Sequence, residues 1–365
     1  MPAISQSSSG VWSNRWMVAK SFEAVPKARP GDRVAVISPA FAAPAVSPAV
    51  HERAMRRLTE ATGLIPVEYP TTRQVGASAE ARAADVTAAF ADPDIRAVLA
   101  TIGGDDQVTV VPHIDAGVLV ANPKPFLGYS DNTNLHNLLW NLGMPSFYGG
   151  STQVHLGPGP YLDDVHLRSL RAALLDGGRL ELTEPGESED FGHLWDDPRA
   201  LTEFGARGAT ESWTWAGPGA VVSGRSWGGC IEVVDQIAVA GRMPAVNELE
   251  GAILLLETGG QAPPAVAVKR WVRALGERGV LAVVAGVLVA RPPVSELGAP
   301  VPPAAERARL RAAQRDAIIE QVARYNPAAV VCVGVPFGHT RPQWIIPHGG
   351  IVTLDGTNRT VVGEY

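Results

Sequence analysis

Residues 124–143, KPFLGYSDNTNLHNLLWNLG, decide the fold. The apolar residues that end at Gly128-Tyr129 predict a short buried strand, and the leucine-rich residues after Asn134 have helical spacing. The polar residues between them form a sharp turn, because the helix begins within a residue or two of Ser130. A strand that passes so directly into a helix is typical of a parallel sheet covered by helices.

The same alternation of strand and helix extends upstream of this stretch. Short β-branched or apolar runs at 34–37, 64–70 and 96–104 predict strands, whereas 47–61 and 78–93 have the composition and spacing of helices. Strands that alternate with helices along the chain indicate a parallel sheet with helices on its faces.

The composition and periodicity of the sequence change between about Gly157 and Gly219. This stretch is rich in Gly, Pro, Asp, Glu and Trp and has no sustained periodicity. We interpret it as a connection between domains with loops over a site, because long irregular stretches within compact proteins are usually functional. The residues beyond it combine apolar strands with helical segments at 265–279 and 302–325.

These patterns predict an α/β protein with an N-terminal parallel-sheet α/β domain and a smaller mixed α/β C-terminal domain. The expected division is an N-terminal extension at 1–30, a first domain at 31–185, a linker with site loops at 186–219 and a second domain at 220–365. Within the extension, residues 5–10 look like a flexible tail.

The composition limits the possible functions. The chain is 46% hydrophobic and 19% charged, which permits a substantial core, and its formal net charge of −6 argues against a nucleic-acid partner. Cys230 and Cys332 lie in apolar or glycine-rich stretches, so we expect reduced structural thiols and no disulfide framework. No apolar run is long enough to span a membrane and no secretory signal is recognisable, so we expect a cytoplasmic protein without a membrane partner.

Ser130 lies at the turn between the strand and the helix, beside the first amides of that helix. Such amides can stabilise an oxyanion, and the amide of Asp131 is a natural donor. The arrangement resembles a nucleophile elbow, although the second glycine of the G-x-S-x-G motif is absent. The alternative is that Ser130 or Asp131 serves only as a helix N-cap.

Other candidate residues also follow predicted strands. Gly103 and Gly104 let the backbone approach a ligand and could supply a second oxyanion donor, although two glycines often form only a turn. Glu257 ends the run AILLLE, where a carboxylate is costly unless it is paired or functional; a solvated residue at the strand end is the alternative. His339 follows a strand in VPFGHT, the kind of loop in which catalytic groups concentrate.

Together these residues supply a nucleophile, a base, an orienting carboxylate and two amide donors, which are the groups that acyl transfer requires. No H-E-x-x-H motif and no paired C-x-x-C motif occurs, so we expect no metal site. A small-molecule binding protein on the same scaffold is the non-enzymatic alternative.

Several motifs connect the chain with a known family. The segments TIGGDDQ, GYSDNTNLHNLLWNLGMPSFYGG, GAILLLE and VPFGH occur in the order and context of the LD-carboxypeptidase family of serine peptidases. The chain resembles this family from PGDRVAVISPA to its C-terminus. The family includes the muramoyl-tetrapeptide carboxypeptidases and the microcin C immunity proteins.

The resemblance implies a Ser-Glu-His triad in which Ser130 is the nucleophile, His339 is the general base and then the acid, and Glu257 orients the histidine. It also implies that the backbone amides of Gly104 and Asp131 form the oxyanion hole. No metal or organic cofactor is implied, and the expected assembly is a homodimer.

Two branches of the family differ in substrate. The carboxypeptidase branch removes D-alanine from murein tetrapeptides, whereas the immunity branch cleaves the amide between an aspartyl residue and a nucleotide-like moiety. IGGDDQ and ESWTWAG look more like the immunity branch, in which aromatic residues stack on adenine. We therefore expect a small peptide or aminoacyl-nucleotide substrate, bound by Gly103, Asp105, Trp213 and Trp215. Core or interface packing is the alternative for the two tryptophans.

Our leading hypothesis is an immunity-type amidase for self-protection or detoxification, and the alternative is an LD-carboxypeptidase in wall recycling. The second hypothesis requires a basic group for the terminal carboxylate, for which Arg341 and Arg270 are candidates. The chain departs from the family pattern at Cys230, where an asparagine is expected, and at Thr258, where an aspartate is common. The first departure bears on substrate contacts and the second on the assignment of Glu257.

Overall fold

The structure, a computed structural model, describes residues 21–365. The tail expected at residues 5–10 lies outside the described residues. In the described part of the expected extension, Val25 and Ala28 are buried in the core of the first domain. This part of the chain therefore packs onto the domain that it precedes.

The first sheet contains mainly parallel strands, as the alternating pattern predicted. Its strands are β1 (Arg33–Ile37), β2 (Ile65–Glu68), β3 (Ile95–Ala100), β4 (Phe126–Gly128), β5 (Ser146–Tyr148) and β14 (Ile346–His348). Their order is β14-β5-β4-β3-β1-β2, and only β14 runs antiparallel to its neighbour. The predicted strands at 34–37, 64–70 and 96–104 are β1, β2 and β3, so the fold prediction for this half is confirmed.

Helices follow most strands of the first sheet. They are α1 (Ala43–Val46), α2 (Pro48–Thr62), α3 (Ala79–Ala91), α4 (Gln107–Val110), η1 (Val111–His113), α5 (Ala116–Ala121), η2 (Ser130–Asn132), α6 (Thr133–Asn141), η3 (Thr152–Leu156), α7 (Asp164–Arg171) and η4 (Ala172–Asp176). Helix α2 ends where Gly63 adopts the left-handed conformation, and α3 begins where the Ser78 hydroxyl accepts from the Ala81 amide.

The second sheet has eight strands and a parallel centre. Its strands are β6 (Arg179–Leu182), β9 (Thr214–Ala216), β10 (Val221–Cys230), β11 (Ile253–Glu257), β12 (Gly286–Ala290), β13 (Val330–Val335), β15 (Ile351–Asp355) and β16 (Thr360–Glu364). They follow the order β6-β16-β15-β10-β11-β12-β13-β9, with β10 to β13 parallel and the outer strands antiparallel. A small separate sheet pairs β7 (Glu187–Ser188) with β8 (Gly208–Ala209).

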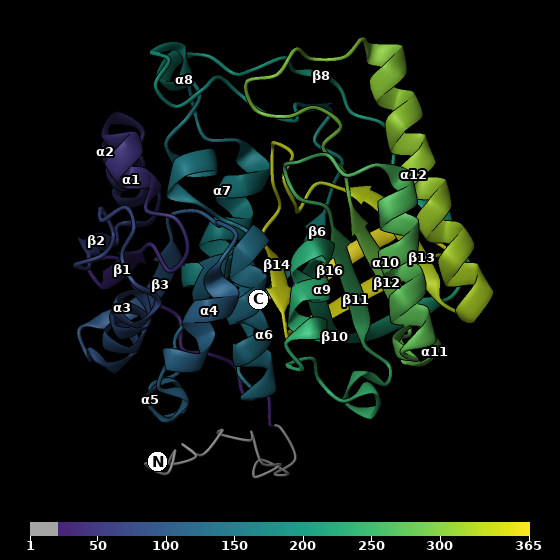
Figure 1. Cartoon of the computed structure of the whole chain (residues 1–365), viewed down its shortest axis with the longest axis horizontal. Coiled ribbons are helices and arrows are strands. Elements are labelled where there is room, and N and C mark those ends of the chain that lie inside the picture. Colours follow the sequence, from purple (N-terminus) through teal and green to yellow (C-terminus); the bar gives the residue numbers. More distant parts are fainter. Residues whose placement is uncertain (1–20) are drawn as a thin grey trace, which may run out of the picture.

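The remaining helices are α8 (Arg199–Thr202), α9 (Ile231–Val239), η5 (Val246–Leu249), α10 (Ala265–Glu277), α11 (Val280–Val283) and α12 (Ala304–Tyr325). Figure 1 shows the early elements on one side of the molecule and α9 to α12 on the other, with the segment that carries α8 and β8 along the top. Within residues 21–365, no helix is both long enough and apolar enough to cross a bilayer.

Two expectations from the sequence need correction. The stretch 157–219 is not irregular throughout, because it contains α7, the π-helical η4 and several short strands. In addition, the expected boundaries at 185 and 220 do not separate the two sheets. Strand β6 pairs with β16 in the second sheet, and β14 returns to pair with β5 in the first. The two sheets are therefore each completed by a strand from the other half of the chain.

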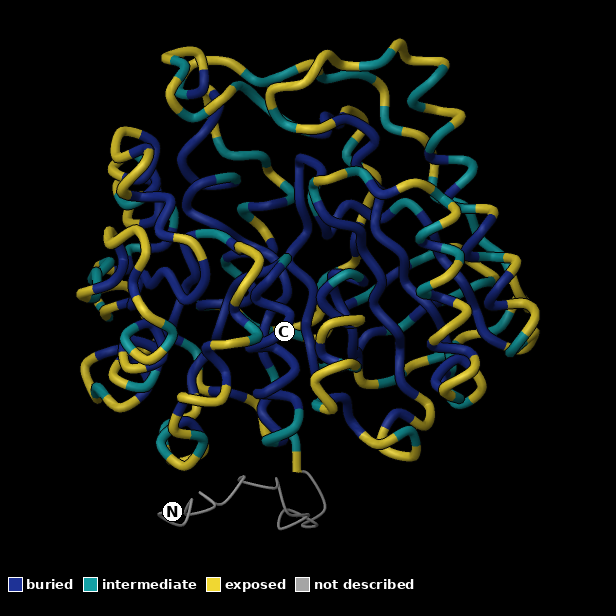
Figure 2. Tube along the Cα trace, in the orientation of Figure 1, coloured by how far each residue is buried: buried dark blue, intermediate teal, exposed yellow. Residues whose placement is uncertain are grey.

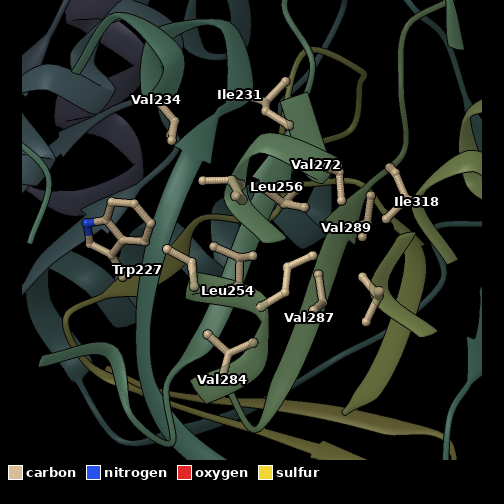
Figure 3. Packing of buried hydrophobic residues seen from close by; sticks show 14 of the residues in the cluster. Trp227, Ile231, Val234, Leu254, Leu256, Val272, Val284, Val287, Val289 and Ile318 are labelled. Carbon is tan, nitrogen blue, oxygen red and sulfur yellow. The ribbon is translucent and has the colours of Figure 1, made fainter. Parts of the chain in front are cut away.

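The largest apolar cluster lies between the second sheet and its helices. Leu254, Leu256 and Val287 project from neighbouring parallel strands toward Val272 of α10 and Ile318 of α12, as Figure 3 shows. Figure 2 shows that the central strands are buried while exposed residues gather at the periphery and along the top. The buried ends of β10 to β13 thus form a fixed platform for the loops that follow them.

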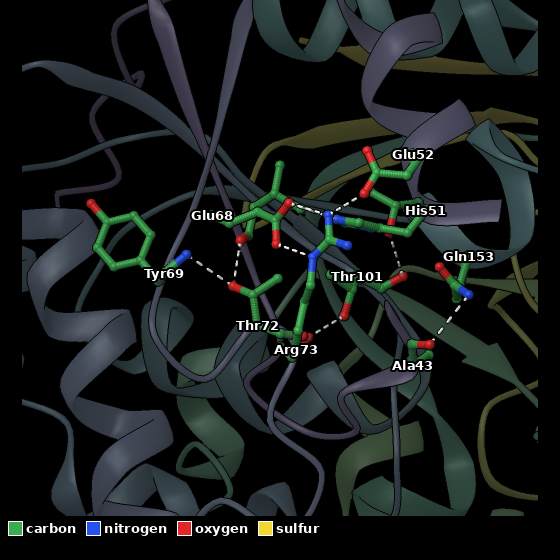
Figure 4. Close-up of polar contacts among 12 residues, drawn as sticks. Ala43, His51, Glu52, Glu68, Tyr69, Thr72, Arg73, Thr101 and Gln153 are labelled. Carbon is green, nitrogen blue, oxygen red and sulfur yellow. Dashed lines mark hydrogen bonds and ion pairs between the residues drawn. The ribbon is translucent and has the colours of Figure 1, made fainter. Parts of the chain in front are cut away.

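A buried hydroxyl network fixes the ends of β1 and β3. The Ser38 hydroxyl lies 2.7 Å from the Thr101 hydroxyl and donates to the Thr72 carbonyl at 2.8 Å. Thr72 in turn donates to Val36 and accepts from the Tyr69 amide. Figure 4 shows part of this network beside the exposed Arg73 ion pairs. The loop that follows Thr101 therefore starts from a well-defined position.

Replacing Leu254 with alanine is expected to lower the free energy of unfolding by about 2–5 kcal/mol, because it leaves a cavity in the middle of this cluster. Urea denaturation followed by circular dichroism measures the change. Val239→Ala is the control, since Val239 is 85% exposed and the substitution is expected to change stability by less than about 0.5 kcal/mol. Equal effects of the two substitutions would contradict the core assignment.

Candidate active site

Ser130 occupies a strained turn between β4 and α6. Its φ of +63° lies in the left-handed region, which a residue other than glycine adopts at a cost of about 1–3 kcal/mol. The Ser130 amide donates to the Tyr148 hydroxyl at 3.1 Å, and the Thr133 hydroxyl donates to the Ser130 carbonyl at 2.6 Å. These two bonds hold the backbone in this conformation.

Ser130, His339 and Glu257 form a continuous hydrogen-bonded row. The Ser130 Oγ lies 3.0 Å from His339 Nε2, and His339 Nδ1 lies 2.7 Å from Glu257 Oε2. With the proton on Nδ1, the imidazole donates to the carboxylate and accepts from the serine hydroxyl. The three side chains come from the loop after β4, the end of β11 and the loop after β13, so both sheets contribute.

Glu257 is a buried carboxylate, and its second oxygen is also satisfied. The Tyr148 hydroxyl donates to Glu257 Oε1 at 2.6 Å, and both side chains are almost fully buried. A buried carboxylate without such donors would cost several kcal/mol. The sequence-based alternative of a solvated residue at the strand end is therefore wrong.

The electrostatics of His339 favour its protonated form. Burial lowers the pKa of the imidazole, but the charge of Glu257 and its hydrogen bond, with a smaller contribution from Glu232, raise the pKa above its ordinary value. Such an imidazole can hold a proton taken from a neighbouring hydroxyl and release it later.

The loop after β3 approaches Ser130 closely. A Cβ atom at Gly103 would lie 2.8 Å from the Ser130 Cβ and 2.9 Å from its Oγ, so only glycine fits there. Gly104, Asp105 and Asp131 line the same cavity as Ser130.

The Asp131 side chain is buried and hydrogen-bonded. Its carboxylate accepts from the Gln107 amide at 2.9 Å and from the Asn134 side chain at 3.0 Å, and burial raises its pKa to about 6. Asp131 thus ties the Gly103 loop to the Ser130 turn, while its amide stays beside the nucleophile.

A cavity of about 620 Å³ opens above Ser130 and His339. Besides the residues named above, its walls include Phe41, Phe191, Trp195, Glu232, Gln236, Gln261, Glu296 and Arg341. This volume is within the range of cavities that hold a small organic ligand.

The segment 186–207, which we call the roof segment, covers one side of this cavity. It contributes Asp190, Phe191 and Trp195 to the wall, and in Figure 1 it runs along the top of the molecule with α8. Glu189 exchanges both backbone hydrogen bonds with Arg341, and their side chains pair at 2.6 Å. Two buried ion pairs join Asp190 to the second domain. The roof segment is therefore anchored at the site.

Trp213 and Trp215 do not line this cavity, so the expectation that they bind substrate there is wrong. Trp215 belongs to the edge strand β9 of the second sheet and pairs with Cys332 of β13, and Trp213 directly precedes that strand. Both pack against the core cluster of that sheet. Trp195 is the tryptophan in the cavity wall, and its carbonyl is held by the Ser47 hydroxyl at 2.8 Å.

The two basic candidates differ in position. Arg341 lines the cavity, but it is buried and its charge is compensated by Glu189. Arg270 is exposed on α10 and is not part of the cavity wall. Neither therefore offers an unpaired cation to a ligand in this cavity.

Comparison with known proteins identifies the family of the chain. The LD-carboxypeptidase N-terminal domain matches residues 34–149, and the LD-carboxypeptidase C-terminal domain matches residues 223–354. A Vibrio cholerae protein named as a carboxypeptidase is 30% identical over 234 residues, which cover 62% of this chain and 67% of the relative. The chain belongs to the LD-carboxypeptidase family of serine peptidases.

The chain is also similar to a microcin self-immunity protein, in sequence and in fold. The Microcin C7 self-immunity protein MccF of Escherichia coli is 30% identical over 169 residues, which are 46% of this chain and 48% of that protein. The structure of MccF in complex with glutamyl sulfamoyl guanosine superposes with a TM-score of 0.80 at 21% identity, covering 93% of this chain and 98% of the other. This likeness confirms the predicted two-domain α/β fold.

The two positions at which the chain departs from the LD-carboxypeptidase family pattern, Cys230 and Thr258, both lie at the site. Cys230 lines the cavity, and its thiol donates to Glu232 at 3.2 Å. Burial raises the pKa of this thiol well above its ordinary value, which keeps it protonated. Thr258 is buried directly after Glu257 and leaves the contact of Glu257 with His339 in place.

Sequence reasoning missed Tyr148, Trp195 and Glu232. A tyrosine at the end of a buried strand, directly before Gly149-Gly150, was a signal for a polar tip near a backbone turn. Trp195 gave only the weak signal of a lone aromatic residue in an irregular stretch. Glu232 resembled an ordinary acidic residue in the first turn of a helix.

Tyr148→Phe is expected to lower kcat for amide hydrolysis by about 10–100-fold, because Glu257 and the Ser130 amide lose a shared partner while the ring keeps its packing. KM is expected to change by less than about threefold. The free energy of unfolding is expected to fall by about 1–3 kcal/mol, since the Ser130 amide is left without an acceptor.

Steady-state kinetics and urea denaturation measure these effects, with the exposed Tyr161→Phe as the matched control. A Tyr148→Phe variant that lost stability but retained full kcat would show that the hydroxyl serves the fold alone.

Proposed function

We propose that the chain is a serine amidase in which Ser130, His339 and Glu257 form a catalytic triad. The observation that carries this proposal is the hydrogen-bonded row, 3.0 Å from Ser130 to His339 and 2.7 Å from His339 to Glu257. His339 takes the Ser130 proton as the hydroxyl attacks the amide carbonyl.

The later steps use the same groups. The tetrahedral oxyanion is stabilised by the backbone amides of Gly104 and Asp131, beside Ser130. His339 then donates its proton to the leaving amine, the carbon–nitrogen bond breaks and an acyl-enzyme remains. A water molecule deprotonated by His339 hydrolyses the ester and restores Ser130.

The proposed substrate is an amide that joins an aminoacyl group to a nucleotide-like moiety, and its hydrolysis would serve immunity or detoxification. Trp195 and Phe191 in the cavity wall support this assignment, because aromatic side chains hold nucleobases by stacking. The similarity to MccF, whose structure contains glutamyl sulfamoyl guanosine, supports it as well.

The second candidate is an LD-carboxypeptidase that releases D-alanine from murein tetrapeptides. The position of Arg341 in the cavity wall favours it, because a terminal carboxylate requires a cation. The pairing of Arg341 with Glu189 at 2.6 Å weakens it, since the charge is already compensated. We therefore place this activity second.

Hydrolysis of aspartyl sulfamoyl adenosine, compared with release of D-alanine from a murein tetrapeptide, tests the proposal. Cleavage of the nucleoside amide is expected, with a loss of at least about 1,000-fold in Ser130→Ala. Trp195→Ala is expected to raise KM by about tenfold, whereas Trp213→Ala serves as the matched tryptophan control and leaves KM unchanged. Release of D-alanine alone would favour the second candidate, and no turnover of either compound would refute both.

The pH dependence tests the role of His339 separately. The free enzyme needs a neutral imidazole, so kcat/KM rises with pH through the pKa of His339. Because this pKa is raised, the acid limb is expected at higher pH than for an ordinary imidazole. Glu257→Gln removes the charge that raises the pKa and leaves burial, which lowers it. The residual activity of this variant is therefore expected to have its acid limb at lower pH.

Rate measurements from about pH 5 to 9 compare the pH profiles of the wild type and the variant. The range is extended by about one unit at each end where the protein is stable. Glu250→Gln, an exposed carboxamide substitution just before β11, is the control and should retain the wild-type profile. An acid limb that stayed in place in Glu257→Gln would contradict the assignment to His339.

A further inference from the structure

Glu232 places a carboxylate in the cavity that Ser130 and His339 share. It lies in the first turn of α9, and Val233 and Gln236 of the same helix also line the cavity. No step of the proposed mechanism uses this side chain.

The partners of Glu232 are neutral. Its Oε1 accepts from the Gly259 amide at 2.9 Å, and its Oε2 accepts from the Cys230 thiol at 3.2 Å. None of the ion pairs among residues 21–365 includes Glu232. Two neutral donors therefore hold the carboxylate in one orientation, and no lysine or arginine of residues 21–365 forms an ion pair with it.

The basic side chains that residues 21–365 contribute to the cavity wall each have an acidic neighbour. Arg341 pairs with Glu189, His339 is hydrogen-bonded to Glu257, and His193 lies 3.7 Å from Glu203. Among these residues, no lysine lines the cavity. The positive end of the α9 dipole, which could otherwise attract an anion, faces the carboxylate of Glu232 itself. The cavity near α9 thus suits a cationic group and disfavours a second carboxylate.

We propose that Glu232 is a specificity-determining residue that binds a primary ammonium group on the acyl part of the substrate. This inference rests on the proposed function, because it assigns the acyl side of the amide that Ser130 attacks. The substrate class is then an amide whose acyl residue carries a free amine, either at its α-carbon or at the end of its side chain. A hydrogen bond between an ammonium and a carboxylate is among the strongest that a protein forms.

The electrostatics around Glu232 agree with this assignment. Burial and the neighbouring Glu257 raise the pKa of Glu232, which means that its ionised form is poorly solvated in the free protein. An ammonium ion would supply the missing opposite charge. The Cys230 thiol, which stands where an asparagine is expected, donates to the carboxylate at 3.2 Å.

Three sulfamoyl adenosines with different acyl groups test the proposal. Alanyl carries only an α-ammonium, N-acetyl-alanyl carries none, and N-acetyl-lysyl carries only a side-chain ammonium. We expect kcat/KM of the wild type to be about tenfold or more higher for a compound with the recognised ammonium than for N-acetyl-alanyl. A preference for alanyl identifies the α-ammonium, and a preference for N-acetyl-lysyl identifies the side-chain ammonium.

Glu232→Gln keeps the shape of the side chain and removes its charge, so it is expected to abolish this preference. Asp235→Asn, an exposed substitution on the same helix, is the matched control and should retain it. Equal rates for all three compounds in the wild type, or an unchanged preference in Glu232→Gln, would overturn the proposal. Thermal unfolding of both variants establishes that each is folded.

Binding separates this proposal from the proposed function. Calorimetry with Ser130→Ala measures the affinity for the same three compounds without any turnover. If the wild type hydrolyses none of them, the proposed function fails, and the affinities alone decide whether Glu232 selects an ammonium. If hydrolysis occurs without discrimination between the acyl groups, the proposed function stands and the role of Glu232 is refuted.

Discussion

The site depends on one buried carboxylate at the end of a central strand. Glu257 is removed from water, and its carboxylate is satisfied because Tyr148 and His339 both donate to it. Tyr148 belongs to the first sheet and Glu257 to the second, so the bond between them joins the two domains directly at the site. The same hydroxyl accepts from the Ser130 amide at 3.1 Å. The Tyr148 hydroxyl that donates to Glu257 therefore also positions the turn that carries Ser130.

The strain at Ser130 is sustained by the same arrangement. A left-handed serine persists only when its surroundings determine it, and here hydrogen bonds hold the amide, the carbonyl and the neighbouring Asp131 side chain. The close approach of Gly103 leaves the side chain little alternative space. Ser130 is thus placed before any ligand arrives, which reduces the reorganisation that a reaction would require.

The sequence predicted the features that depend on local pattern. The turn at Ser130 and the positions of Glu257 and His339 at strand ends follow from apolar runs that stop abruptly, and the structure has them where expected. The pairing of β6 and β14 across the two sheets could not be predicted in this way, because it joins strands that are far apart in the chain. That Trp195 lines the cavity and Trp213 does not could not be predicted either, because it depends on the path of the roof segment, which has no periodicity.

The same roof segment explains the charge of the cavity. Holding an irregular segment over a cavity requires strong local bonds, and here Glu189 and Asp190 provide them through arginines of the second domain. Buried ion pairs of this kind contribute little net stability. Removing one partner is nevertheless costly, because it leaves an uncompensated buried charge, so each arginine stays paired with its carboxylate. Arg341 is the one arginine that residues 21–365 contribute to the cavity wall, and its pairing with Glu189 leaves it unavailable to a ligand. Because Arg341 is paired, the cavity presents the carboxylate of Glu232 to a substrate. The proposed selectivity for an ammonium group therefore depends on the ion pairs that attach the roof segment.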